Sequence, residues 1–259
     1  MTDLQGILQR FAPISLEEME SVKLMNRIDT KFVVNLNQLP AILEKAQEAY
    51  FVQETAGIRL ATYDTVYYDT DDLDMYIRHH NRQLVRQKIR VRQYVESQLT
   101  FLEVKRKNNR GRTKKKRIAI AGFNPKGDDI GKGKEEVKIA DFIKNKSRYT
   151  WDVLSPHLRT SFRRITLVNK LKTERLTIDL NLEWTNLLNG TKMMFPNLVV
   201  IELKRDGNAF SPMLSIMQEE RIKPLKISKY CIGTALTMPN VKQNRFESKI
   251  HRIVKLLNC

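Results

Sequence analysis

The sequence predicts an α+β fold: an antiparallel β-barrel of about eight strands with a polar, basic interior and helices packed outside. Several segments alternate polar and apolar residues with a period of two, which is typical of strands with two different faces. The polar residues in these segments are mainly Lys and Arg. The chain also contains amphipathic helices, whose apolar stripes need a surface to cover. If these helices cover the outer face of the sheet, the charged face lines a tunnel.

Length and composition indicate one folded domain with a polyanionic partner. The chain has 259 residues, enough for a sizeable core, and we expect a single domain over residues 1–259. A hydrophobic content of 41% excludes wholesale disorder. The formal net charge of +17 indicates nucleic acid, an anionic membrane or phosphate-rich small molecules as the partner.

The cysteine, histidine and hydropathy patterns argue against a disulfide-rich, zinc-binding, membrane-spanning or secreted protein. Cys231 and Cys259 are too few for a disulfide framework, and the four histidines form no metal-ligand pattern. No apolar run approaches the roughly 18 residues of a membrane helix, and residues 1–10 lack the apolar region of a signal peptide. We therefore expect a cytoplasmic location. A basic amphipathic helix over about 243–258 is expected to pack against the body, with a peripheral membrane contact as the alternative.

The elements follow from periodicity and from local start signals. The expected strands are 26–34, 59–69, 83–95, 100–107, 112–120, 162–168, 175–182 and 197–205. The expected helices are 15–25, 37–50, 71–80, 135–145, 151–157, 211–221, 229–237 and 246–257. Ser15 and Glu18 form a capping-box pattern, Asn37 and Ser228 are candidate N-caps, and Pro212 follows an N-cap at Ser211.

Rows of cations on the three central strands need an explanation. Lys88, Arg90 and Arg92 share one strand face, Lys105 and Lys107 follow Glu103 on the next strand, and simple alternation adds Arg112, Lys114 and Lys116. Two unit charges ~4 Å apart repel by roughly 1 kcal/mol in water and by about 4 kcal/mol in partly excluded surroundings. Like charges across a β-ladder are destabilising. A polyanion site therefore explains these rows better than a solvated sheet face.

Other predicted strands also carry a polar face. Strand 26–34 places Arg27, Asp29 and Lys31 on one side. In strand 175–182, Arg175, Thr177, Asp179 and Asn181 alternate strictly with leucine and isoleucine. Strand 197–205 repeats the Glu103-x-Lys105 arrangement with Glu202-x-Lys204.

Together these segments resemble the successive motifs of a known family. The motifs are Arg27-x-Asp29-x-Lys31-Phe32, Tyr68-Asp69-Thr70, Lys88-x-Arg90-x-Arg92, Leu102-Glu103-x-Lys105-x-Lys107, Gly111-Arg112-Thr113-x-Lys115, Arg175-x-Thr177-x-Asp179, Ile201-Glu202-x-Lys204 and Ser228-Lys229-Tyr230. They resemble the VTC domain, the catalytic module of the vacuolar transporter chaperone polyphosphate polymerases, within the triphosphate tunnel metalloenzyme superfamily. The resemblance covers about residues 25–237, which we expect to form the core.

The resemblance implies an eight-stranded tunnel barrel that binds the triphosphate of ATP with a divalent metal, Mn²⁺ or Mg²⁺. The expected catalytic residues are Lys31, Arg90, Arg92, Lys105 and Lys229. The expected phosphate and ATP contacts are Arg27, Lys88, Lys107, Arg112, Lys115, Arg164, Arg175 and Lys204. Glu202 is the expected metal ligand, and Glu103 is the second acidic candidate. At two places the sequence leaves open which residue faces the interior. One choice is between Arg163 and Arg164, and the other is between Lys115 and its neighbours Lys114 and Lys116. The family motif usually has Tyr where Phe162 stands.

The implied reaction transfers the γ-phosphoryl group of ATP to a growing inorganic polyphosphate chain. The partners are therefore ATP and inorganic polyphosphate, together with a separate membrane partner if the product is exported. One alternative keeps the tunnel but uses water as the acceptor, which makes the protein a metal-dependent triphosphatase. A second alternative is a non-catalytic nucleic-acid-binding module, but the sequence shows no recognised nucleic-acid motif. The sequence predicts no oligomeric state.

Overall fold

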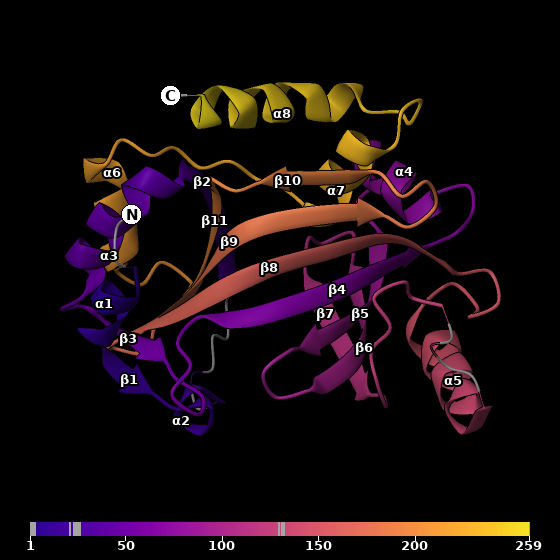
Figure 1. Ribbon diagram of the computed structural model, residues 1–259, viewed down its shortest axis with the longest axis horizontal. Helices are drawn as coiled ribbons and strands as arrows, with labels where there is room; N and C mark the ends of the chain where they lie inside the picture. Colours follow the sequence, from indigo (N-terminus) through magenta and orange to yellow (C-terminus); the bar gives the residue numbers. More distant parts are fainter. Residues whose placement is uncertain (1–3, 21, 23–26, 129, 131–132, 259) are drawn as a thin grey trace.

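The centre of the fold is a strongly curled antiparallel sheet (Figure 1). A computed structural model of the protein describes residues 4–20, 22, 27–128, 130 and 133–258. The main path of the sheet follows the order β2 (Arg27–Asn35), β11 (Leu198–Asp206), β9 (Glu174–Asn186), β8 (Ser155–Asn169), β4 (Ala61–Asp69), β5 (Arg86–Tyr94), β6 (Leu99–Lys107) and β7 (Thr113–Ala119). The α+β class and the eight antiparallel strands with helices outside are confirmed. Among the described strands, β7 does not pair with β2, so the curled sheet is a half-barrel.

Three short strands and ten helical segments complete the described part of the chain. The strands are β1 (Ala12–Ile14), which pairs with β3 (Tyr50–Gln53), β3, which also pairs with β8, and β10 (Lys192–Phe195), which pairs with β9. None of the three was predicted. The helical segments are α1 (Leu4–Gln9), α2 (Leu16–Glu20), η1 (Leu36–Gln38), α3 (Leu39–Ala46), α4 (Asp74–His80), η2 (Gly133–Glu135), α5 (Glu136–Lys146), α6 (Pro212–Glu219), α7 (Lys229–Thr237) and α8 (Asn244–Leu257).

Helices cover the outer face of the sheet in two places. At one end of the molecule α1, α3 and α6 gather over the apolar side of β2 and β11, where Phe32 and Ile201 pack with Ile42 and Met213 (Figure 1). Fully burying side chains of this size contributes about 1.5–3 kcal/mol each. This packing directs the alternate residues of the same strands, which are polar, toward the concave side.

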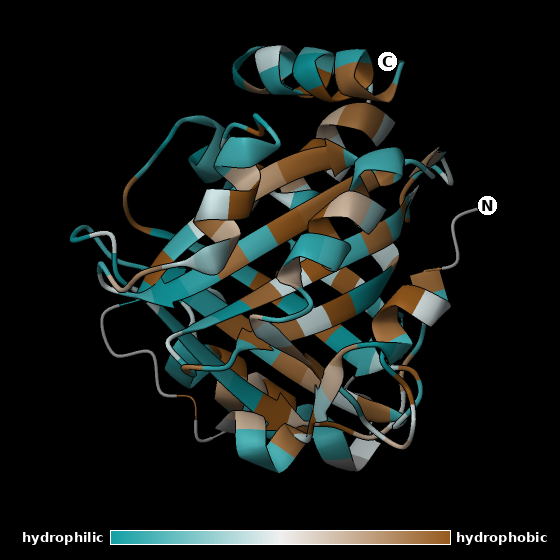
Figure 2. Cartoon of the chain, turned by 90° about the vertical axis from the view of Figure 1, so that its left-hand side faces the viewer, coloured by the Kyte–Doolittle hydropathy of each residue, from teal (hydrophilic) through white to brown (hydrophobic). Residues whose placement is uncertain are grey.

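The second outer cluster lies under α5. Val91 of β5 and Val104 of β6 are almost completely buried against Ile139 and Ile143 of this helix. Figure 2 shows hydrophilic and hydrophobic residues alternating along the strands. The apolar side chains of β5 and β6 pack in this outer cluster. The alternate side chains of both strands, which are mainly polar, therefore face the concavity.

Helix α7 packs on the concave side instead. Its residues Tyr230 and Ile232 join a buried cluster with Tyr67 of β4 and Trp184 of β9. The indole Nε1 of Trp184 donates a hydrogen bond to the carbonyl oxygen of Lys229 at 3.0 Å. The helix begins with a side-chain cap, because Ser228 Oγ accepts from the backbone N–H of Cys231. The predicted start of this helix is confirmed, and it places Lys229 at the edge of the polar interior.

A bulge in β9 marks where the interior face changes from polar to apolar. Asn181 has a φ of 51°, and the pairing of β8 with β9 shifts register beside it. Asp179 faces the interior before the bulge, whereas Leu182 and Trp184 pack toward α7 after it. The predicted strict alternation through Leu182 is therefore wrong, because an extra residue in one strand reverses its phase.

Several local boundaries also differ from the prediction. The helix expected over 151–157 does not form, because a turn there leads into β8 at Ser155. The helix expected over 37–50 starts with η1 and ends at Ala46, and its cap is Asn35 rather than Asn37. The capping box of α2 is confirmed by reciprocal bonds between Ser15 and Glu18. Residues 21 and 23–25 of that expected helix lie outside the described residues.

The helix α8 lies across the body, with Phe246 and Ile253 buried (Figure 1). It contacts β2 and α7, as the packed-helix interpretation expected. None of the helices in the described part of the chain is both long and apolar enough to cross a membrane.

We predict that Gly233→Ala destabilises the protein by about 1–3 kcal/mol. A Cβ at position 233 would come within 2.2 Å of Trp184 Cδ1 and 2.8 Å of Leu158 Cδ2. Helix α7 would therefore have to shift away from β8 and β9. Chemical denaturation followed by tryptophan fluorescence measures the loss. The exposed substitution Ser248→Ala in α8 is the control, expected within about 0.5 kcal/mol of wild type. Equal stability of Gly233→Ala and wild type would contradict this close packing.

Candidate functional site

The concave face gathers cations from seven strands of the main path and from α7. Their strand phase is opposite to that of the outer apolar clusters. The cations are Arg27 and Lys31 of β2, Lys88, Arg90 and Arg92 of β5, Lys105 and Lys107 of β6, Lys115 of β7, Arg164 of β8, Arg175 of β9, Lys204 of β11 and Lys229 of α7. Three of the inward carboxylates, Glu103, Asp179 and Glu202, each contact two cations and so divide many of these cations into clusters.

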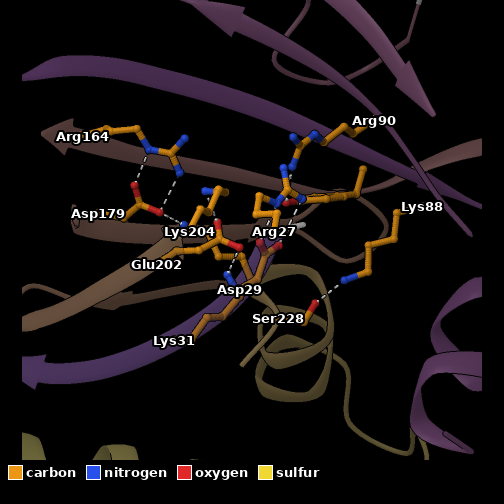
Figure 3. Close-up of polar contacts among 12 residues, drawn as sticks. Arg27, Asp29, Lys31, Lys88, Arg90, Arg164, Asp179, Glu202, Lys204 and Ser228 are labelled. Carbon is orange, nitrogen blue, oxygen red and sulfur yellow. Dashed lines mark hydrogen bonds and ion pairs between the residues drawn. The ribbon is translucent and has the colours of Figure 1, made fainter. Parts of the chain in front are cut away.

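The first cluster centres on Glu202 of β11 (Figure 3). Its Oε1 lies 2.6 Å from Lys31 Nζ, and its Oε2 lies 3.1 Å from Lys204 Nζ. Burial alone raises the pKa of a carboxyl group, but Lys204 and Lys31 hold the pKa of Glu202 well below its ordinary value. Burial, opposed by Glu202, lowers the pKa of Lys204 to about 8. Glu202 is therefore a carboxylate at neutral pH, between two ammonium groups.

The second cluster centres on Glu103 of β6, which is only 1% exposed. Arg90 lies directly opposite on β5, and its Nε and Nη2 are 2.7 and 2.6 Å from Glu103 Oε2. Lys115 of β7 reaches Oε1 at 3.1 Å. Burial opposes ionisation, but the neighbouring Arg90, Arg92 and Lys115 lower the pKa of Glu103 below its ordinary value.

The third cluster centres on Asp179 of β9, which is 2% exposed. Arg164 of β8 makes a two-pronged contact with it, at 2.5 Å from Nε to Oδ1 and 2.8 Å from Nη2 to Oδ2 (Figure 3). Lys229 of α7 donates to Oδ2 as well. These cations keep the pKa of Asp179 below its ordinary value despite its burial. Burial lowers the pKa of Lys229 to about 7, with the Asp179 charge opposing this shift and Arg164 adding to it.

Aromatic rings fill the space between the second and third clusters. Phe162 stacks on Tyr63 with 5.4 Å between ring centroids. The guanidinium carbon of Arg92 lies 5.6 Å from the Phe162 ring, and Lys229 Nζ lies 4.2 Å from it. Arg92 also donates to Thr65 Oγ1 at 3.0 Å. Phe162 thus stands among the predicted phosphate-binding cations at the position where the family motif usually has Tyr.

Two other residues that we expected in the site, Lys88 and Arg27, have partners outside the three clusters. Lys88 Nζ donates to Ser228 Oγ at 2.6 Å, which joins β5 to the start of α7 (Figure 3). Arg27 donates to Asp29 along β2, at 2.6 Å from Nε to Oδ1.

Lys105 and Arg175 stand apart from the clusters, because neither makes an ion pair with another described residue. Burial lowers the pKa of Lys105 to about 8, although the charge of Glu202 acts in the opposite direction. Burial and the neighbouring Arg27 and Arg164 also lower the pKa of Arg175. A desolvated cation without a counter-ion gains most from an anionic ligand.

The phase of β7 differs from the alternation expected from Arg112. Lys115 pairs with Lys105 in the ladder and faces inward, whereas Lys114 and Lys116 pair with Arg106 and Val104 on the outer face. The expectation that Lys114 and Lys116 share the inner face is therefore wrong, and the resemblance-based choice of Lys115 agrees with the ladder. Arg112 lies in the turn before β7, where it lines an outer pocket.

At the other open position the inward arginine is Arg164, because it contacts Asp179, while Arg163 pairs with Leu180 in the ladder. Sequence reasoning missed Asp179 as an interior carboxylate. The Arg175-x-Thr177-x-Asp179 alternation was the signal that could have identified it.

Glu202 and Thr177 offer oxygen ligands for a divalent cation. Among the described residues, no group of three or more His, Cys, Asp or Glu side chains could hold a metal on its own. Glu202 is the ladder partner of Thr177, whose buried Oγ1 has no hydrogen-bond partner among the described residues. Mg²⁺ sites in phosphoryl-transfer enzymes commonly use one or two carboxylates, with phosphate oxygens as further ligands. The residues therefore fit a cation that enters together with a phosphate ligand.

The arrangement as a whole suits a linear chain of phosphates. Arginine can contact phosphate through two N–H groups at once, and lysine adds a compact charge. Along β5, Arg92 to Arg86 covers six residue steps, or about 20 Å of strand. The cations are fixed in place by the sheet, so binding requires little reorganisation.

One comparison with known proteins, the match to a family model, agrees with the resemblance. The family model of the VTC domain matches residues 26–238. A search of curated proteins finds no match. Among solved structures, a candidate adenylate cyclase from Vibrio parahaemolyticus is 10% identical, with 81% of this chain and 99% of that chain covered and a TM-score of 0.47. A Hippeastrum protein described as a candidate adenylyl cyclase with a dominant triphosphatase activity is 15% identical, with 83% and 98% covered and a TM-score of 0.46.

We predict that affinity for tripolyphosphate falls by at least about tenfold between pH 7 and pH 9. A lysine is charged below its pKa, and the pKa values of Lys229, Lys105 and Lys204 lie at about 7, 8 and 8, so all three lose charge in this range. Isothermal titration calorimetry measures the profile. Lys229→Arg keeps its charge throughout and should flatten the profile. An affinity independent of pH in wild type would contradict the depressed lysine pKa values.

Proposed function

The chain belongs to the VTC domain family, which indicates phosphoryl-transfer or triphosphatase chemistry, and we propose that it is an ATP-dependent polyphosphate polymerase. The observation that carries the proposal is the convergence of cations from seven strands and α7 on one concave face. Such a face binds a triphosphate, and the reaction extends a polyphosphate chain by the γ-phosphoryl group while ADP leaves.

The length of the cation row favours a polymer over a single nucleotide. Lys105 and Lys107 continue the row beyond the Glu103 cluster toward the end of the β6–β7 hairpin. Lys88 lies beside them on β5. A triphosphatase needs a cage for one triphosphate, whereas a polymerase needs further contacts for the acceptor chain. The additional cations supply such contacts.

In the proposed mechanism, the protein positions two phosphate groups and stabilises the charge that develops between them. Phosphoryl transfer needs the acceptor oxygen in line with the leaving oxygen, and the protein provides little covalent chemistry. Arg164 and Lys229 hold one region of the phosphate chain, and Arg90 and Lys115 hold another. Each pair is oriented by a buried carboxylate, Asp179 or Glu103, so the cations are already in place when the ligand arrives.

Lys31 and Lys204 complete the site around Glu202. A divalent cation held by Glu202, with Thr177 beside it, would neutralise charge on the phosphate oxygens. Lys105 faces Glu202 across the interior and carries no ion pair of its own within the described residues, so it is free to contact the incoming chain.

We predict that Arg90→Ala lowers the rate of polyphosphate formation by about 10²–10³-fold, the usual cost of removing one preorganised charge donor. The assay incubates the full chain with ATP and Mn²⁺ and separates long phosphate chains from free phosphate on a gel. Lys170→Gln, at an exposed position in the β8–β9 turn, is the control and should match wild type.

The same assay separates the two enzymatic hypotheses. Release of free phosphate without long chains would overturn the polymerase proposal in favour of a triphosphatase. Wild-type activity in Arg90→Ala would remove this residue from the proposed site.

We predict that Glu202→Gln weakens Mn²⁺ binding by at least about tenfold in the presence of tripolyphosphate, because the amide removes the only carboxylate we assign to the metal. Electron paramagnetic resonance measures free Mn²⁺ directly, without turnover. Asp152→Asn is the control, since Asp152 is exposed in the turn before β8. Unchanged Mn²⁺ affinity in Glu202→Gln would exclude the proposed metal role.

A further inference from the structure

A second basic pocket lies on the outer face of the sheet, with a volume of about 590 Å³. Its lining comes from the ends of β5, β6 and β7 and from Asn145 and Lys146 at the C-terminal end of α5. The lining residues, which we call the hairpin pocket, are Val85, Gln87, Val104, Arg106, Lys107, Asn108, Asn109, Arg112, Lys114, Lys116, Asn145 and Lys146. None of them is acidic.

The cations of the hairpin pocket have no counter-ions among the described residues. Lys114 and Lys116 project from the outer phase of β7, and Lys114 is the ladder partner of Arg106 on β6. Lys146 approaches from the last turn of α5. Among the described residues, none of these four cations forms a salt bridge, in contrast to the cations of the interior clusters. Like charges opposite one another destabilise a ladder, so this arrangement favours an anion between them.

Neutral polar groups of the pocket complement the cations. The Asn108 Oδ1 accepts a hydrogen bond from the backbone N–H of Arg112 at 2.9 Å, which fixes the turn that presents the arginine. Among the described residues, no side chain forms a hydrogen bond or salt bridge with the side-chain amide of Asn109 or the guanidinium of Arg112. Their donors are therefore available to a ligand. Amide and guanidinium donors suit phosphate oxygens.

The shape and composition of the pocket distinguish between polyanions. The lining contains no aromatic side chain, whereas proteins that bind single-stranded nucleic acid commonly stack bases on aromatic rings. Its apolar lining is limited to Val104, which is buried, and Val85, which is about half exposed, so the pocket offers no long apolar stripe to a lipid surface. A narrow chain of phosphates without bases fits this lining best.

Lys107 connects the pocket to the interior. It shares the inner strand phase of Glu103 and Lys105, yet it also lines the hairpin pocket at the end of β6. Arg86 of β5 is the direct ladder partner of Lys107, so the row of cations continues to the end of β6. A linear polyanion can therefore follow cations from the concave face to the outer face.

We propose that the hairpin pocket is a second binding site, which holds a distal segment of the inorganic polyphosphate chain whose end lies in the interior. The choice of ligand rests on the proposed polymerase function. The site adds affinity for long chains through a second contact on the same molecule, and short oligophosphates, which cannot reach both places, gain nothing from it.

The test measures binding to the full chain by calorimetry, without ATP. The ligands are long-chain polyphosphate, tripolyphosphate, a single-stranded oligonucleotide and anionic vesicles. Lys114→Gln/Lys116→Gln should weaken binding of the long chain by about tenfold, or about 1.4 kcal/mol, and leave tripolyphosphate binding unchanged. Both lysines are exposed on the outer face of β7, so folding should be preserved. The control Lys170→Gln/Lys172→Gln removes the same charge from the β8–β9 turn and should bind both ligands as wild type does.

Each outcome decides the proposal. Equal long-chain affinity in the double variant and wild type overturns it, and so does an equal loss in the control, which would reflect net charge alone. A loss confined to a single-stranded oligonucleotide or to anionic vesicles overturns it in favour of that partner. If the double variant loses long-chain binding but wild type forms no polyphosphate from ATP, the site stands and the polymerase function fails.

Discussion

Mutual repulsion among cations on one concave face is the constraint on which the rest of this structure depends. The sheet can hold them together because Glu103, Asp179 and Glu202 each sit between two cations on different elements. A buried charge that loses its partner costs about 3–5 kcal/mol, so these carboxylates are structural as well as functional. They also limit the positive charge that the empty site must tolerate, while leaving Lys105 and Arg175 without ion pairs among the described residues. Binding and folding thus share the same contacts.

Much of the fold could be predicted because polar and apolar residues alternate along most of the long strands. The eight strands of the main path were all expected, as were the helices that begin at Ser211 and Ser228. The failures occur where a single residue changes the phase or where the apolar pattern is ambiguous. Asn181 reverses the alternation of β9 through a left-handed backbone that sequence alone does not reveal. Residues 151–157 carry apolar side chains at helical spacing, but long-range pairing with β4 draws their second half into β8.

The candidate site was predictable in residue types and only partly in position. Strand phase identified Arg90 and Glu202, and the resemblance identified Lys115. Counting from Arg112 failed on β7 because the chain turns before the strand begins, and a one-residue slip exchanges the faces. The partnership of Asp179 with Arg164 and Lys229 depends on register between distant segments, which no local pattern encodes. The hairpin pocket depends on the phase that β7 actually has, because this phase places Lys114 and Lys116 on the outer face.

The open edge of the half-barrel has a consequence for how the protein behaves at high concentration. Among the described strands, β7 pairs only with β6, so its other edge exposes backbone groups to which a strand of a second molecule could add. Four consecutive cations, Lys114 to Arg117, run along that edge. Two such edges repel one another strongly, which opposes edge-to-edge aggregation without a covering helix. The basic run that serves polyanions thereby also keeps the molecules apart.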